Sequence, residues 1–129
     1  MRALSLALLF TLLITGCGDR IDDLAKKLSS QKKFDLGMSI SCDLPASASP
    51  TEIASNAFRA TFINPTVTNF TIVAIRDVRI PDSMSKDSQY TALLADSNLG
   101  QKIVLFKLQH CFGDRGHWDE WWSRVYEPQ

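Results

Sequence analysis

The chain has 129 residues, of which 45% are hydrophobic and 22% charged, and its 14 Lys and Arg residues balance its 14 Asp and Glu residues. This length suits one ordinary domain with a modest core. The balanced charge argues against a nucleic-acid partner, because proteins that bind nucleic acid usually carry a clear basic excess.

The first 17 residues have the pattern of an export signal. Met1-Arg2 precedes an almost wholly apolar run from Ala3 to Ile14, and the chain turns polar soon after Cys17. A charged start, a short apolar core and small residues behind it are typical of a secretory signal, and the run is too short for a membrane-spanning helix. Residues 14–17, Ile-Thr-Gly-Cys, resemble the lipobox of bacterial lipoproteins.

The resemblance implies that residues 1–16 are a cleaved signal peptide and that Cys17 receives a diacylglycerol group and a further fatty acid such as palmitate. Two or more acyl chains hold a protein stably on a bilayer. Gly18, and not Asp, follows Cys17, which in this family favours the outer over the inner membrane. We therefore expect a protein anchored in the cell envelope on its periplasmic side.

The three cysteines support this interpretation. With Cys17 lipidated, Cys42 and Cys111 remain, and an oxidising compartment favours a disulfide between them. The alternative for Cys111 is a metal site with His110 and His117, whose spacing matches no standard zinc motif. We expect no metal and no cofactor.

Four strands are predicted, over residues 36–42, 58–64, 67–80 and 102–110. The first alternates strictly between apolar and small residues, and the last is apolar at both parities, which indicates a central strand covered on both faces. In the third, the alternation slips around Arg76-Asp77, which predicts a bulge or a second short strand.

Helices are predicted near residues 19–30, 84–97 and 117–126, where apolar residues recur three and four positions apart. A further helix starts at Ser49-Pro50-Thr51-Glu52, which has the pattern of a capping box, and whether it stops near Asn56 or continues through Phe58 stays open. The expected fold is α+β, a small, mainly antiparallel sheet of about four strands with helices packed on it and one disulfide. Residues 17–35 would form the lipidated Cys and a helical tether, and residues 36–129 a single domain.

The candidate binding face is the aromatic set Trp118, Trp121, Trp122 and Tyr126, placed on one side of the last predicted helix. It suits core packing, a protein partner or stacking on sugar rings. We expect no enzyme, because His110 and His117 lie in no known catalytic motif, and a hydrolase would need one of them beside a carboxylate in a cleft.

The expected function is a membrane-anchored, non-enzymatic protein-interaction module. It would serve as an accessory subunit of an envelope or secretion assembly, or as a small inhibitor or immunity-type protein. The alternative is a lipoprotein that binds cell-wall glycan, with peptidoglycan as its partner, through the tryptophan face.

Overall fold

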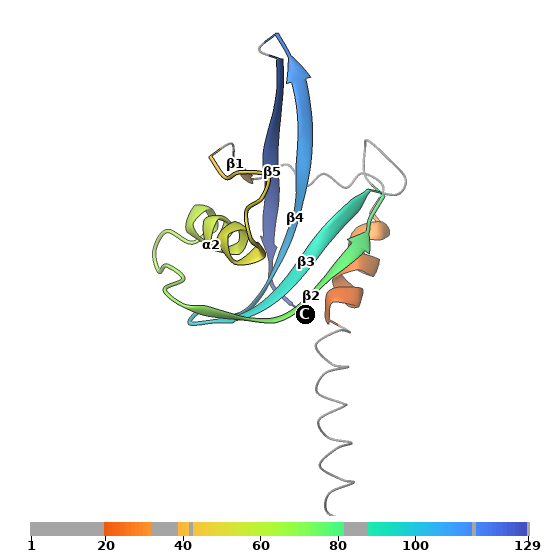
Figure 1. Cartoon of the computed structure of the whole chain (residues 1–129). Helices are drawn as coiled ribbons and strands as arrows, with labels where there is room; N and C mark the ends of the chain where they lie inside the picture. The colour runs from red at the N-terminus through yellow and green to blue at the C-terminus, as the bar shows by residue number, and fades with distance from the viewer. Residues whose placement is uncertain (1–19, 32–38, 42, 82–87, 115, 129) are drawn as a thin grey trace, which may run out of the picture.

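The computed structural model describes residues 20–31, 39–41, 43–81, 88–114 and 116–128. Its five strands form one antiparallel sheet in the order β1-β5-β4-β3-β2, with a helix on each face (Figure 1). The strands are β1 (Ser39–Ser41), β2 (Phe70–Arg79), β3 (Gln89–Ser97), β4 (Gly100–Gly113) and β5 (Gly116–Tyr126). The described helices are residues 20–29 and α2 (Pro50–Thr61), and no helix in this part of the chain has the length and apolarity needed to cross a membrane.

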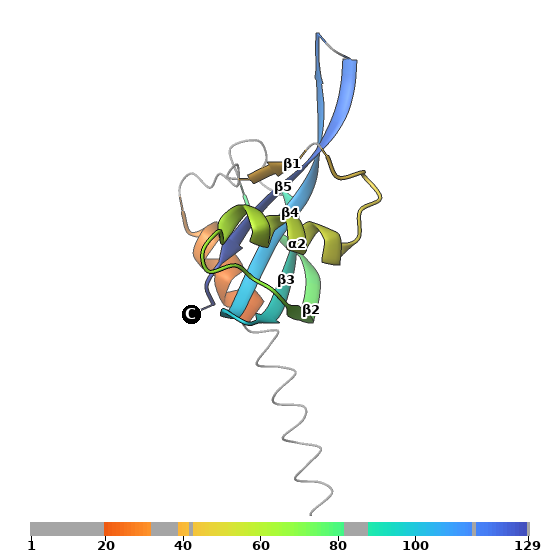
Figure 2. The same cartoon turned by 90° about the vertical axis from the view of Figure 1, so that its left-hand side faces the viewer.

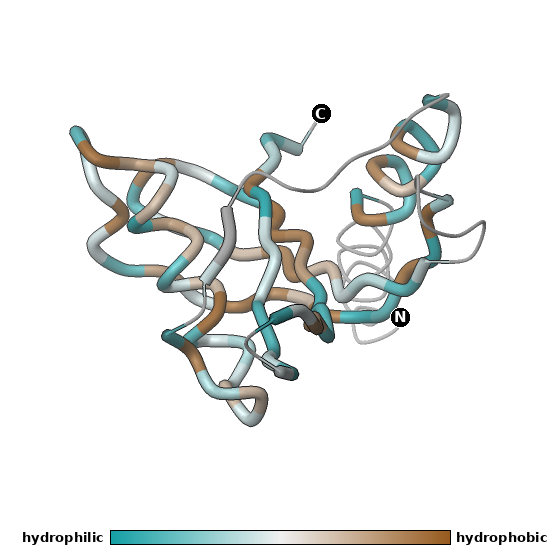
Figure 3. Tube along the Cα trace, turned by 90° about the horizontal axis from the view of Figure 1, so that it is seen from above, coloured by the Kyte–Doolittle hydropathy of each residue, from teal (hydrophilic) through white to brown (hydrophobic). Residues whose placement is uncertain are grey.

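The two helices lie on opposite faces of the sheet, so that the buried side chains form two clusters (Figure 2). Seen from above, the tube has hydrophobic stretches in the middle of the molecule as well as on its outer parts (Figure 3). The cluster under the helix over 20–29 contains Ile21, Leu28, Val78, Ile80, Tyr90, Ala92, Leu94, Ile103 and Leu105. The cluster under α2 contains Ile53, Ala54, Ala57, Phe58, Leu93, Ala95, Val104 and Phe106. The α+β class and the antiparallel sheet are confirmed, with five strands in place of four.

Strand β4 is the doubly covered central strand that its sequence predicts. Ile103 and Leu105 point into one cluster, and Val104 and Phe106 point into the other. Neighbouring side chains of a strand point to opposite faces, so a continuous apolar run can be buried completely only when both faces are covered.

Helix α2 begins as the capping pattern predicts and continues through Phe58, the second of the two open alternatives. The Ser49 hydroxyl accepts a hydrogen bond from the Glu52 backbone N–H at 3.2 Å. The strand predicted over 58–64 is wrong, because the helix continues to Thr61. Phe58 shares the buried face of the helix with Ile53, Ala54 and Ala57, and this helical spacing prevails over the short alternation of Phe58, Ala60 and Phe62.

Strand β2 confirms the strand predicted over 67–80 and places its bulge earlier. The pairing with β3 shifts between Ile72 and Ala74, and not near Arg76-Asp77. Val73 is the extra residue. Ile72 before the shift packs on the α2 side, whereas Ala74 and Val78 after it pack on the side of the helix over 20–29.

The helices predicted over 84–97 and 117–126 are wrong. Residues 89–97 form β3 and residues 116–126 form β5, while 82–87 lie outside the described residues. In β3 the run Ala92 to Ala95 is buried at both parities between the two helices. A two-residue turn, Asn98-Leu99, connects β3 to β4. The first residue of β4, Gly100, has a φ of 93°.

The first predicted strand is confirmed for Ser39–Ser41, which pairs with Trp121–Ser123 of β5. The rest of that predicted strand, including Cys42, lies outside the described residues. In the sheet order, β5 lies between β1 and β4, the strand that carries Cys111. The Cys42–Cys111 disulfide stays a prediction.

Candidate functional site

The two last strands extend beyond the rest of the sheet as a hairpin. They pair from Ile103↔Tyr126 to Gly113↔Gly116, whereas β3 pairs with β4 only as far as Phe106 and β1 reaches β5 only at residues 121–123. Among the described residues, 109–113 and 116–120 therefore pair only with each other. We call these two segments the arm, and it projects from one end of the molecule in both side views (Figures 1 and 2).

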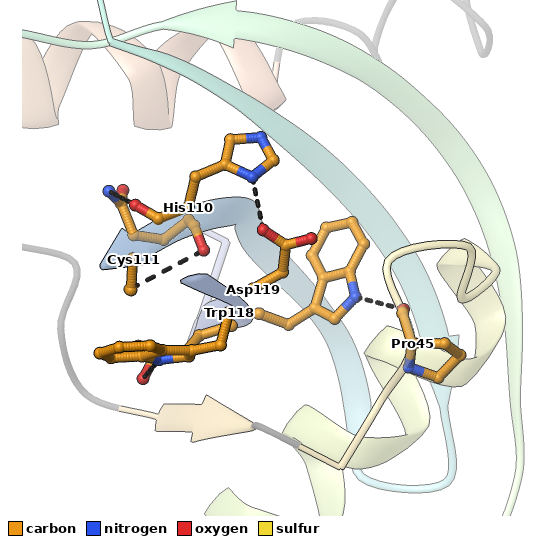
Figure 4. Close-up of polar contacts among 8 residues, drawn as sticks. Pro45, His110, Cys111, Trp118 and Asp119 are labelled. Atoms are coloured by element: carbon orange, nitrogen blue, oxygen red, sulfur yellow. Dashed lines mark hydrogen bonds and ion pairs between the residues drawn. The ribbon is translucent and has the colours of Figure 1, made fainter. Parts of the chain in front are cut away.

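The predicted tryptophan face does not exist as one surface. On strand β5, the alternation of side chains places Trp122 and Tyr126 with the cluster under the helix over 20–29, and places Trp121 with the α2 cluster. Trp121 packs edge-on against Phe106, with ring centroids 5.9 Å apart, and its Nε1 donates to the Pro45 carbonyl at 2.8 Å (Figure 4). Trp118 is the exposed indole of the three, at 40%.

The carboxylate of Glu120 links two of the indoles. The Nε1 groups of Trp118 and Trp122 donate to the two oxygens of Glu120, each at 2.8 Å. The three residues alternate along β5 and so share one face. Trp118 also lies against Gly113, where an added Cβ would come within 3.4 Å of its ring. The exposed indole is thus held in a fixed orientation.

The opposite face of the arm carries a histidine–carboxylate pair. His110 lies directly across from Asp119, and its Nδ1 is 2.5 Å from the Asp119 Oδ1. Nearby, the ring of His117 packs on that of Phe112, with centroids 6.0 Å apart. Figure 4 shows His110 and Asp119 pointing toward each other, away from the side that carries Cys111 and Trp118.

This pair meets one of the two conditions for a hydrolase. The histidine is beside a carboxylate, but its side chain is 78% exposed on the arm and not set in a cleft. A pocket of about 280 Å³ lies elsewhere, and it is lined by Arg20, Asp23, Leu24, Lys27, Tyr126, Glu127 and Pro128. Within the described ranges, no group of three His, Cys, Asp or Glu side chains is placed to hold a metal ion.

The remaining predicted site residues are Cys17, Cys42 and Cys111. The first two lie outside the described residues, and Cys111 is half-buried in β4, opposite Trp118. Comparison with protein-family models found no match, and comparisons with curated proteins and with solved structures also found none.

Proposed function

We propose that this protein is a lipid-anchored lipoprotein of the cell envelope, held by Cys17 on the periplasmic side of the outer membrane, and that it works as a non-enzymatic protein-interaction module. The arm is the surface that meets the partner. The partner is a larger envelope or secretion assembly, or a protein that this domain inhibits. A Cys42–Cys111 disulfide belongs to the same proposal.

The main support is the position of the arm relative to the anchor. Arg20 follows Cys17 by three residues, and three residues span at most about 11 Å. The helix that begins at residue 20 and the C-terminus lie together at one end of the molecule, and the turn of the arm lies at the other (Figures 1 and 2). A domain anchored at Cys17 would therefore present the arm away from the bilayer.

The chemistry of the arm also supports a partner. Phe112 is 78% exposed near its turn, on the opposite face from Trp118. An isolated two-stranded hairpin is marginally stable in water, and exposed strand edges and large apolar side chains are typical of binding surfaces. Burying a Phe side chain contributes about 1.5–3 kcal/mol, so a partner that covers Phe112 would stabilise the arm as it binds.

Glycan binding is the second candidate, and it rests on Trp118 with Glu120. A fixed indole beside a carboxylate offers a flat apolar surface and hydrogen-bond acceptors to a sugar ring. The site is smaller than the three-indole face predicted from the sequence, because Trp121 lies on the other side of the strand.

The test is photo-crosslinking in living cells, with a photoreactive amino acid at Phe112 or, as a control, at Thr71, an exposed residue of edge strand β2. We expect a discrete crosslinked protein from position 112 and none from position 71. Equal crosslinking at both positions would argue against the arm. Sedimentation with purified peptidoglycan, lost in Trp118→Ala and retained in Phe112→Ala, would favour the glycan alternative.

A further inference from the structure

The pocket lies at the end of the molecule opposite the arm. Its wall on one side is the helix over 20–29, and on the other it is the chain that leaves β5. Arg20 and Lys27 are seven residues apart on that helix and so lie on the same side of it, about 10 Å apart along its axis. Leu24 lies between them, and Pro128 faces it from the other wall.

The residues that line the pocket carry two positive and two negative charges, and one of the negative charges is balanced by a lysine outside the pocket, which leaves one positive charge in excess. Glu127 lines the pocket, but both of its oxygens accept from the Lys102 ammonium at 2.7 Å, so its charge is already balanced. Asp23 offsets one of the two cations of the helix, Arg20 and Lys27. Neither cation forms an ion pair with another described residue. A group with a single negative charge therefore complements the pocket.

A buried hydroxyl supplies a second, independent indication. Tyr126 lines the pocket, and its oxygen is buried and forms no hydrogen bond of good geometry with a described residue, although the Arg124 guanidinium lies over its ring at 5.2 Å and interacts with the hydroxyl. An unpaired buried hydroxyl costs free energy, and turning the Tyr126 side chain toward a ligand oxygen in the pocket would relieve that cost. An anion that accepts hydrogen bonds suits this hydroxyl and the two cations together.

We propose that this pocket binds the phosphodiester of a phospholipid headgroup, held by Arg20, Lys27 and the Tyr126 hydroxyl. The inference rests on the proposed anchor, which places Arg20 within about 11 Å of the acylated Cys17 and therefore at the headgroup layer. A phosphodiester carries the single negative charge that the pocket lacks. The lipid contact would fix the tilt of the domain on the bilayer.

The test compares nanodiscs of two lipids without net charge, the zwitterionic phosphatidylcholine and a galactolipid that has no phosphate, each carrying the acylated full-length mature protein. Amide hydrogen exchange is measured over residues 20–28 and 124–128. We expect amide exchange to be about tenfold slower in phosphatidylcholine discs than in galactolipid discs. This factor corresponds to the contribution of one charge-assisted hydrogen bond to stability. Lys27→Gln should lose this protection, and the matched control Lys26→Gln, the exposed neighbour outside the pocket, should keep it.

Equal exchange in the two lipids would overturn the proposal, as would equal loss of protection in both lysine variants. Protection restored in galactolipid discs by inorganic phosphate would assign the pocket to a soluble phosphate in place of a lipid. The intact mass of the sample shows whether Cys17 is acylated. It therefore distinguishes a failure of the proposed anchor from a failure of the proposed pocket. If Cys17 is not acylated, a soluble short-chain phosphatidylcholine provides the same readout, and its failure to protect residues 20–28 would still refute the pocket.

Discussion

Neutralising Lys102 and neutralising Glu127 should change stability by different amounts, because only Lys102 of this ion pair is buried. The Lys102 side chain is 7% exposed and its ammonium lies over the Phe62 ring at 5.5 Å, whereas Glu127 is 66% exposed. Removing one partner of a fully buried pair costs about 3–5 kcal/mol, because the other charge stays buried and unpaired. Since water reaches the Glu127 side, we expect Glu127→Gln to lower the free energy of unfolding by about 2 kcal/mol.

Lys102→Met removes the charge and keeps the aliphatic contact with Phe62, so its effect should stay below about 1 kcal/mol. The double variant should then match Lys102→Met alone, because no buried ammonium remains. Urea unfolding with a shared m-value measures all three differences. A Lys102→Met variant as unstable as Glu127→Gln, or a Glu127→Gln variant as stable as the parent, would refute this account of the pair.

Three further predictions concern the cap of helix α2, the Tyr126 hydroxyl and the cysteines. Ser49→Ala should lower the free energy of unfolding by about 1 kcal/mol because it removes the α2 cap. Ser49→Asp should retain most of the stability, because Asp is also a good N-cap residue. Burial raises the pKa of Tyr126 above its ordinary 10.0 although the Arg124 charge lowers it, so the folded state holds the proton that the unfolded state releases first. Stability should therefore fall as the pH rises above about 10, and less steeply in Tyr126→Phe, as chemical unfolding across this range would show. The intact mass of native protein should show an acylated Cys17, and thiol labelling without reductant should leave Cys42 and Cys111 unmodified; ready labelling of both would exclude their disulfide.

The sequence predicted the elements whose periodicity has one interpretation. Strand β4 is apolar at both parities over a short run, and the start of α2 has Ser, Pro and Glu at fixed positions. Strand β3 was mistaken for a helix because Tyr90, Leu93 and Leu94 fit both a helical face and a strand buried on both sides. Only the two covering helices, which lie far from β3 in the sequence, decide between these structures.

The same ambiguity between helix and strand prevented the side-chain contacts of the arm from being predicted. Spacing of three and four positions placed the three indoles on one helical face, whereas a strand separates Trp121 from Trp118 and Trp122. The Glu120 link between two indoles needs side chains that alternate along a strand. The contact of His110 with Asp119 needs the register of a hairpin, which one sequence does not specify when the turn length is unknown.

The packing of the helix over 20–29 limits what an anchored domain could reach. Ile21 is 1% exposed against the sheet, yet it lies only four residues after Cys17. Four residues span at most about 14 Å. The linker between the anchor and the folded domain would therefore be very short, in contrast to lipoproteins carried on long flexible linkers. Anchored in this way, the domain could not move far from the membrane. The distance from the bilayer at which a partner contacts Phe112 would be set by the length of the folded domain itself.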